Sequence, residues 1–292
     1  MPELLAPAGS WEALEAAVAA GADAVYLGGR GFNARASASN FDAEGLPRAV
    51  DFCHLRGVKV LVTVNTLLRE EELEPALQLV EELRQAGADG LIVQDLGLAQ
   101  AIAQTWPDAP LHASTQMSIH NVQGAQALCQ LGFRRVVLAR ELSLSDIQAV
   151  VQATPLEVEC FAHGALCVSV SGKCLMSSLI GGRSGNRGRC AQPCRLPYHL
   201  LRGQETVAEG YLLSPKDLCT LPRLAQLVQT GVSSLKLEGR LKRPEYVSVV
   251  TGVYRRALDA IAEYGDYHAT PEDEAALLRI FNRGGFTSGY LH

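Results

Sequence analysis

Eight short apolar or β-branched runs, separated by amphipathic stretches, constrain the fold of this chain more than any other feature. The runs are Glu3 to Ala6, Ala24 to Gly28, Lys59 to Asn65, Gly90 to Asp95, Leu111 to Met117, Arg135 to Arg140, Leu156 to Ala162 and Ser234 to Gly239. Helical patterns such as Trp11 to Ala20, Asp42 to Arg56, Glu71 to Ala86 and Ser145 to Ala153 lie between them. Strands that alternate with helices are typical of repeated βα units around a parallel sheet.

A recurring glycine marks the end of several of these helices. It stands before the next strand in AAGADAVYLGG, RQAGADGLIVQD, LCQLGFRRVVLAR and VQTGVSSLKLEGR. Glycine suits the left-handed cap that ends a helix, and the repetition of the phrase behaves like an internal repeat. We therefore predict one α/β domain over residues 1–292, a TIM-like (β/α)8 barrel, in preference to an open Rossmann-like sheet, with a last barrel helix over Pro244 to Tyr264.

One connection interrupts the βα rhythm. Residues 165–232, between the seventh and eighth strands, are rich in Cys, Gly, Arg and Ser. Long loops inside a compact domain are usually functional, and a loop that follows a barrel strand lies at the mouth, where active sites are found. The Gly-rich, aromatic end after residue 265 resembles the start of further structure, which would fit a truncated C-terminal extension.

Composition narrows the setting of the protein. The chain is 48% hydrophobic and has a net charge of -5, which argues against indiscriminate coating of nucleic acid but allows a local basic patch to dock RNA. It has no apolar run of about 20 residues and no basic start followed by an apolar segment. We therefore expect a cytoplasmic protein with no membrane partner.

Cysteines cluster in the predicted insertion. Five of the eight lie between Cys167 and Cys219, and four follow the pattern Cys167-x6-Cys174-x15-Cys190-x3-Cys194. Cytosolic thiols that cluster usually serve metals or catalysis, and four of them suit a 4Fe-4S cluster or a structural zinc. Because paired Cys-x2-Cys knuckles are absent, an iron-sulfur cluster is favoured over zinc. Cys219 is an alternative fourth ligand, and four unligated thiols are the remaining alternative.

Charged side chains are predicted to point into the barrel. Strand alternation turns Lys236 and Glu238 inward and places Glu159, Phe161 and His163 on one side of their strand. Ionised groups are costly to bury unless they are paired or used. This makes a candidate catalytic set, with a structural ion-pair network such as Lys236 with Glu159 or Glu238 as the alternative; the set is His163, Glu159, Lys236, Glu238, Arg140 and Gln116.

A second set of residues is predicted to bind substrate. Several are arginines in or near the insertion, where they suit bidentate contact with phosphate or carboxylate, and the alternative is solvated loop charge. RNA and a small carboxylate donor are the ligands that this chemistry favours. The candidate residues are Asn33, Arg35, Asn65, Arg187, Arg189, Arg195 and Arg240.

The insertion also carries a family signature. The order E-x-F-x-x-G-x-x-C-x4-G-x-C-x-x-S is formed by Glu159, Phe161, Gly164, Cys167, Gly172, Cys174 and Ser177. Together with LLAPAGSWEALEAAVAAGADAVYLG, NRGRCAQPCR, SPKDL and SLKLEGRLKRPEYV, it resembles the peptidase U-32 family, also called collagenase-like proteases. The resemblance covers nearly the whole chain.

The resemblance implies hydroxylation rather than proteolysis. Members of this family include prephenate-dependent tRNA wobble-uridine 5-hydroxylation proteins, a 23S rRNA cytidine hydroxylation protein and paired ubiquinone hydroxylation proteins. It implies a 4Fe-4S cluster on Cys167, Cys174 and Cys190, with Cys194 preferred as fourth ligand. The NRG-x-C-x-Q-P-C-R phrase favours the RNA branch, so we expect iron-sulfur-dependent hydroxylation of a tRNA or rRNA nucleoside, with prephenate as donor and with a protein partner or redox system.

Two alternatives remain for the activity. One is the peptidase that the family name asserts, although the sequence has neither an H-E-x-x-H zinc motif nor a G-x-S-x-G elbow. The other is a cluster-bearing partner subunit in oxygen-independent quinone hydroxylation.

Overall fold

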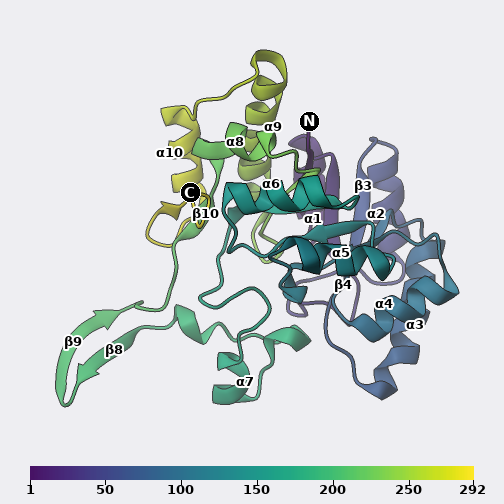
Figure 1. Ribbon diagram of the computed structural model, residues 1–292, viewed down its shortest axis with the longest axis horizontal. Helices are drawn as coiled ribbons and strands as arrows, with labels where there is room; N and C mark the ends of the chain where they lie inside the picture. The colour runs from purple at the N-terminus through teal and green to yellow at the C-terminus, as the bar shows by residue number, and fades with distance from the viewer.

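The computed structural model describes residues 1–292, and eight parallel strands in it close into a barrel (Figure 1). Each strand pairs in parallel with its sequence neighbour, and β11 closes the ring by pairing with both β1 and β7. The predicted barrel is therefore confirmed, with strand ends that shift by one to four residues. The strands are β1 (Glu3–Pro7), β2 (Ala24–Gly28), β3 (Lys59–Val64), β4 (Gly90–Val93), β5 (Leu111–Ala113), β6 (Arg135–Val137), β7 (Glu157–Gly164) and β11 (Ser234–Leu237).

Helices surround the barrel and bury their apolar faces against it. The predicted glycine caps are confirmed, because Gly21, Gly87, Gly132 and Gly231 all have φ between +84° and +88°. The helix starts are capped by side chains such as Ser10, which accepts from the backbone N–H of Ala13. The barrel helices are α1 (Trp11–Ala19), α2 (Gly45–His54), α3 (Leu73–Gln85), α4 (Leu96–Thr105), α5 (Val122–Gln130), α6 (Leu144–Ala153), α8 (Leu224–Gln229) and α9 (Pro244–Tyr264).

The chain leaves the barrel between β7 and β11. It forms α7 (Met176–Gly181) and the hairpin of β8 (Tyr198–Arg202) and β9 (Glu205–Gly210), which extends away from the body in Figure 1. At β10 (Asp217–Cys219) the chain returns and pairs antiparallel with the end of β7. The predicted insertion over 165–232 therefore divides: 165–216 leaves the barrel, and 217–232 belongs to its wall.

The residues after 265 pack back onto the barrel. They form α10 (Pro271–Ile280) and β12 (Phe286–Thr287), and β12 pairs with β10. Short 3-10 turns connect other elements, namely η1 (Glu70–Glu72), η2 (Thr115–Met117), η3 (Gly185–Arg187), η4 (Pro193–Arg195) and η5 (Leu221–Arg223). None of the helices combines the length and the apolar character that a membrane crossing requires.

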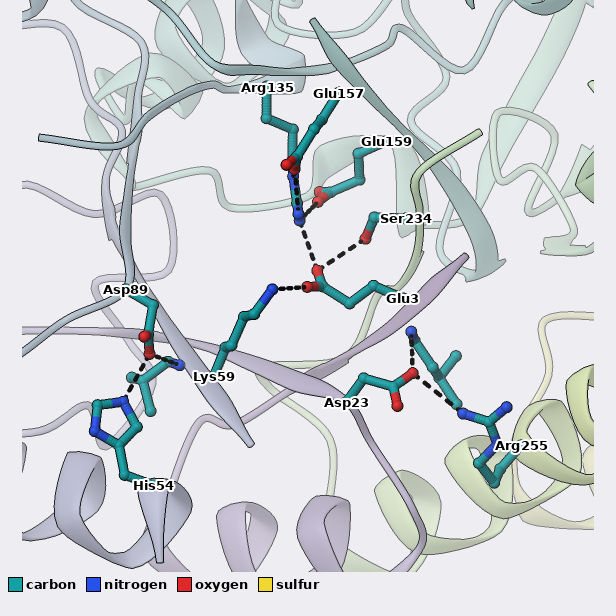
Figure 2. Close-up of polar contacts among 12 residues, drawn as sticks. Glu3, Asp23, His54, Lys59, Asp89, Arg135, Glu157, Glu159, Ser234 and Arg255 are labelled. Carbon is teal, nitrogen blue, oxygen red and sulfur yellow. Dashed lines mark hydrogen bonds and ion pairs between the residues drawn. The ribbon is translucent and has the colours of Figure 1, made fainter. Parts of the chain in front are cut away.

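A network of charged side chains, which we call the charged column, joins β1, β6, β7 and β11 near the amino-terminal ends of the strands (Figure 2). Arg135 Nη1 lies 2.6 Å from Glu3 Oε1 and 3.1 Å from Glu159 Oε2, and Arg135 Nη2 lies 2.6 Å from Glu157 Oε2. Glu159 is fully buried, and its other oxygen accepts from Lys236 Nζ at 2.7 Å. Burial alone would raise the pKa of Glu159, but Lys236 and Arg135 outweigh it and lower that pKa. The alternative of a structural ion-pair network is thus realised for Glu159 and Lys236.

Removal of Arg135 should destabilise the protein strongly. The substitution Arg135→Met leaves Glu159 buried with one cation instead of two, and a broken buried pair typically costs about 3–5 kcal/mol. Urea unfolding should show this loss. The exposed pair of Arg84 and Glu81, at 2.8 Å, provides the control, because Arg84→Met should cost less than about 1 kcal/mol. Equal costs for the two variants would show that the column does not depend on Arg135.

Candidate active site at the barrel mouth

A cavity of about 320 Å³ opens at the carboxyl ends of the barrel strands. Its floor is formed by strand side chains, among them Tyr26, Thr63, Phe161 and Lys236. Its roof is formed by residues 165–195, the part of the insertion that we call the strap. The cavity lies where (β/α)8 barrels carry their active sites, and its volume suits a nucleobase or a small carboxylate.

The strap is latched to the barrel loops by Arg187. Its two terminal nitrogens bind the two carboxylate oxygens of Glu72 at 2.5 Å each, and Nη1 also donates to the carbonyl oxygen of Leu67 at 2.6 Å. This bidentate contact lowers the pKa of Glu72 to about 2. Next to the latch, Gly188 has φ +71° and packs so closely on the Asn33 carbonyl that a Cβ would clash with it. Arg187 does not line the cavity, so the structure gives it a role in holding the strap rather than the predicted role in binding substrate.

Arg195 clamps the strap from the other side. Its Nη1 donates to Ser214 Oγ and to the Pro215 carbonyl, both at 2.8 Å, and its Nη2 donates to the Leu166 carbonyl. These contacts hold the two ends of the excursion together. Arg195 lines the cavity, but its guanidinium is committed to protein groups, so it supplies positive charge rather than free donors. Arg189 is exposed and does not line the cavity.

The four predicted cysteine ligands line this one cavity. Cys167, Cys174, Cys190 and Cys194 are all free thiols. Burial raises the pKa of Cys194, and Arg195 opposes that rise. The other three cysteines raise the pKa of Cys194 further, which shows that the four sulfur atoms lie close enough to affect one another's charge.

Cys219 does not belong to this group. It is buried in the barrel core, with its sulfur 3.8 Å from the hydroxyl oxygen of Tyr254, and it does not line the cavity. The predicted preference for Cys194 over Cys219 therefore agrees with the placement of the two thiols.

Four cysteines of one cavity could serve as ligands of either a 4Fe-4S cluster or a zinc ion, because both accept four cysteine ligands. No three His, Cys, Asp or Glu side chains in the structure are already arranged to hold a single metal ion.

Glu238 is the only carboxylate that lines the cavity. Its Oε1 accepts from Arg35 Nη2 at 2.8 Å. Burial would raise the pKa of Glu238, but Arg35 and then Arg140 outweigh it and lower that pKa to about 2. Glu238 is therefore ionised at neutral pH and orients the guanidinium of Arg35.

Arg240 and Arg140 both line the cavity and donate hydrogen bonds to neighbouring protein groups. Arg240 Nη1 donates to Thr63 Oγ1 at 2.9 Å and to Asn33 Oδ1 at 3.4 Å, and burial lowers the pKa of Arg240 to about 10. Arg140 Nη1 donates to the Ala165 carbonyl at 2.6 Å, its guanidinium lies 4.3 Å from the centre of the Phe161 ring, and its Nε is buried without a partner.

Of the remaining polar residues predicted for the site, two line the cavity and one, Asn33, does not. Asn65 and Gln116 line the cavity, and Gln116 Oε1 is buried without a partner. Asn33 lies behind the wall, where its Nδ2 donates to the Gly29 carbonyl at 2.9 Å and its Oδ1 accepts from the Arg35 backbone N–H. Asn33 therefore shapes the loop that presents Arg35.

His163 lies outside the cavity, and the prediction that it shares a face with Glu159 and Phe161 is wrong. The pairing of β11 with β7 shifts between Lys236 and Leu237, which is a β-bulge. A bulge re-aims the following side chain, so His163 points away from the barrel interior. It packs against Tyr254 and Phe286, and burial lowers its pKa to about 3. Glu159 also does not line the cavity, because it lies deeper in the charged column.

Two cationic residues of the cavity wall, Lys242 and Arg283, were not predicted from the sequence. Lys242 follows β11, and Arg283 follows α10. The phrase LKRP contained the signal for Lys242. For Arg283 no local signal existed, because only the return of the C-terminal segment to β10 brings it to the mouth.

The fold and this site define a class: a (β/α)8-barrel protein with a strap of four free cysteines over a cation-rich cavity. The chain belongs to peptidase family U32, whose model matches residues 9–292. The resemblance found in its motifs is thereby confirmed.

Curated relatives are similar over most of the chain. The 23S rRNA 5-hydroxycytidine C2501 synthase of Escherichia coli is 48% identical over 263 residues, which cover 89% of this chain and 40% of the relative. The tRNA hydroxylation protein P1 of Bacillus subtilis is 38% identical over 280 residues, which cover 93% and 65%. A collagenase of Porphyromonas gingivalis is 36% identical over 307 residues, which cover 99% and 73%. The chain thus spans less than two thirds of the first two relatives.

Loss of the latch should loosen the strap. The substitution Glu72→Gln removes the charge that binds Arg187 bidentately, so amide hydrogen exchange in residues 183–190 should become faster, by roughly the tenfold that corresponds to about 1.4 kcal/mol. Mass spectrometry of peptides measures this exchange. Glu81→Gln, which removes an exposed partner of Arg84, should leave the strap unchanged. Unaltered exchange in Glu72→Gln would show that the latch does not hold the strap.

Proposed function

We propose that this chain is an RNA-hydroxylating enzyme that holds a 4Fe-4S cluster on Cys167, Cys174, Cys190 and Cys194. The observation that carries the proposal is a single cavity in which four free cysteines meet seven cations and one carboxylate. The printed names of two relatives, a 23S rRNA 5-hydroxycytidine synthase and a tRNA hydroxylation protein, supply the substrate class. The proposal includes a cytoplasmic location, which such a substrate favours.

The charge of the cavity suits an anionic substrate. Seven cationic side chains line it in a chain of net charge -5, so positive potential is focused at the mouth. An RNA backbone and a carboxylate donor such as prephenate both carry the matching charge. The seven residues are Arg35, Arg140, Arg195, Lys236, Arg240, Lys242 and Arg283.

The cavity is a place for one base rather than a duplex. A volume of about 320 Å³ admits a nucleobase that has left its stack, as enzymes that modify bases require. Phe161 and Gln116 are among the residues that line the space that the base would occupy. When bound, the cluster supplies one-electron redox chemistry beside that space.

Side chains of the cavity floor would bind the substrate and orient it. The guanidinium groups of Arg140 and Arg240 line the cavity, where they suit a carboxylate or phosphate on the floor. Lys236 Nζ donates to Glu159 Oε1 at 2.7 Å, and burial lowers the pKa of Lys236 although Glu159 opposes that effect. The ionised carboxylate of Glu238 pairs with Arg35 and fixes the position of its guanidinium.

A peptidase is the second candidate, because the collagenase relative carries that name. The cavity lining argues against it. Its residues include several serines and cysteines but no histidine and no aspartate that would act as the base of a nucleophile. A partner subunit in quinone hydroxylation is the third candidate, and the seven cations disfavour a neutral acceptor of that kind.

The RNA assignment is tested by nucleoside mass spectrometry. Total RNA from a strain that lacks the gene should miss one hydroxylated pyrimidine nucleoside, and the wild-type chain should restore it while Cys167→Ala should not. If every hydroxylated nucleoside survives the deletion, the proposal is wrong. Casein and gelatin assays of the same purified protein test the peptidase alternative, for which we expect no cleavage.

The cluster assignment is tested by a matched pair of cysteine variants. Anaerobically purified Cys194→Ser should lose most of its iron and sulfide and its broad visible absorption, because serine is a poor replacement for a thiolate ligand. Cys219→Ser should retain them, because that thiol lies in the core. Equal iron in wild type and Cys194→Ser would remove Cys194 from the ligand set, and a colourless wild type would remove the cluster.

A further inference from the structure

A group of three cations lies on one wall of the cavity, at its rim. Arg195 comes from the strap, Lys242 from the loop after β11, and Arg283 from the segment after α10. We call these residues the rim cluster. The proposed function has used the floor cations, and it assigns no individual role to Lys242 or Arg283.

The rim cluster carries more positive charge than the protein neutralises. Asp217 Oδ1 binds Arg283 Nη1 at 2.5 Å, and Asp217 is the only carboxylate in contact with the cluster. Arg195 donates only to carbonyl and hydroxyl oxygens. Lys242 lies on the ring of Phe281 and near that of Tyr246 rather than against a carboxylate.

Lys242 is the least compensated of the three. It is half-buried, and burial followed by the charge of Arg283 lowers its pKa to about 8. A partly desolvated ammonium without an anionic partner is costly to keep. A bound anion would supply the missing charge and the missing hydrogen-bond acceptor.

The backbone beside Lys242 favours an anion as well. Helix α9 begins at Pro244, two residues later, and its N-cap, Arg243, makes no side-chain capping bond. The N-terminus of this 21-residue helix carries partial positive charge, part of which Glu245 in its first turn offsets. By analogy at the level of the fold, (β/α)8 barrels frequently bind phosphate at the loops after their seventh and eighth strands, which here carry Arg195 and Lys242.

The position of the cluster distinguishes a polymer from a small ligand. Arg240, on the floor, is only 5% exposed, so only a group that enters the cavity reaches it. The side chain of Arg283 is 22% exposed at the rim, where a nucleic-acid backbone would pass if its base occupied the cavity. We propose that Lys242 and Arg283 bind a backbone phosphate of the RNA next to the nucleoside held in the cavity, an inference that rests on the proposed function.

The salt dependence of RNA binding tests this proposal. The affinity of the anaerobically purified full chain for a single-stranded oligoribonucleotide is measured over a range of salt concentrations. Lys242→Gln should reduce the slope of log affinity against log salt by about 0.7, which weakens binding about fivefold at 0.1 M salt. Lys59→Gln is the control, because Lys59 is exposed at the opposite end of the barrel and should leave the slope unchanged.

A second measurement needs no RNA. The chain has five lysines, Lys59, Lys173, Lys216, Lys236 and Lys242, so acetylation by an N-hydroxysuccinimide ester can be followed at each by mass spectrometry. Inorganic phosphate should slow the acetylation of Lys242 relative to Lys59, compared with chloride at the same ionic strength.

The outcomes separate this inference from the proposed function. Normal RNA hydroxylation with an unchanged salt slope in Lys242→Gln would overturn the phosphate contact alone. Phosphate protection of Lys242 with an unchanged slope would also overturn it, because the anion would then be a small ligand. A wild-type chain that neither binds nor modifies RNA would remove the proposed function itself, whatever phosphate does to Lys242.

Discussion

The burial of Glu159 is the constraint on which the rest of the barrel depends. A fully buried carboxylate is tolerable only with compensating charge, and here Arg135 approaches from β6 and Lys236 from β11. Those two cations lie on the strands that flank β7. A change in the register of β6, β7 or β11 would therefore separate Glu159 from at least one of its partners. Glu3, on β1, extends the same network across the point where the barrel closes.

The charged column also determines what the cavity above it offers. Lys236 is both the upper end of the column and a residue of the cavity floor, so its ammonium is presented to a ligand while Glu159 holds it. The ring of Tyr26 lies 4.4 Å from Lys236 Nζ, and the Tyr26 hydroxyl donates to the Leu237 carbonyl. The floor is therefore rigid before any ligand enters, which is the preorganisation that binding and catalysis favour.

The sequence predicted the barrel well because its signals are local. Alternation located the strands, and the glycines at the helix ends located the turns, with Gly21 and Gly231 in the left-handed region as expected. Alternation also oriented Lys236 inward correctly. It failed at His163, because the β-bulge next to it depends on the pairing of β7 with β11, which no single-strand pattern reveals.

The insertion was harder to predict, because tertiary contacts decide the role of each arginine. Composition alone made Arg187 and Arg195 appear equivalent to Arg35 as substrate ligands. In the fold, Glu72 and a set of backbone carbonyls consume the first two, and these contacts suspend the four cysteines over the cavity.

The division of the basic residues explains how an acidic chain presents a positive site. Arg187 is paired with Glu72 and Arg195 donates to uncharged oxygens, while Lys242 and Arg283 line the mouth with a single carboxylate, Asp217, in contact with Arg283. In the proposed cluster, the four cysteine ligands would bring negative charge to the same cavity, and the surrounding cations would lower the cost of holding them as thiolates. The proposed cluster and the proposed anionic substrate would thus share one positive environment. The pairing of Glu238, the single carboxylate of the cavity lining, with Arg35 fits that environment.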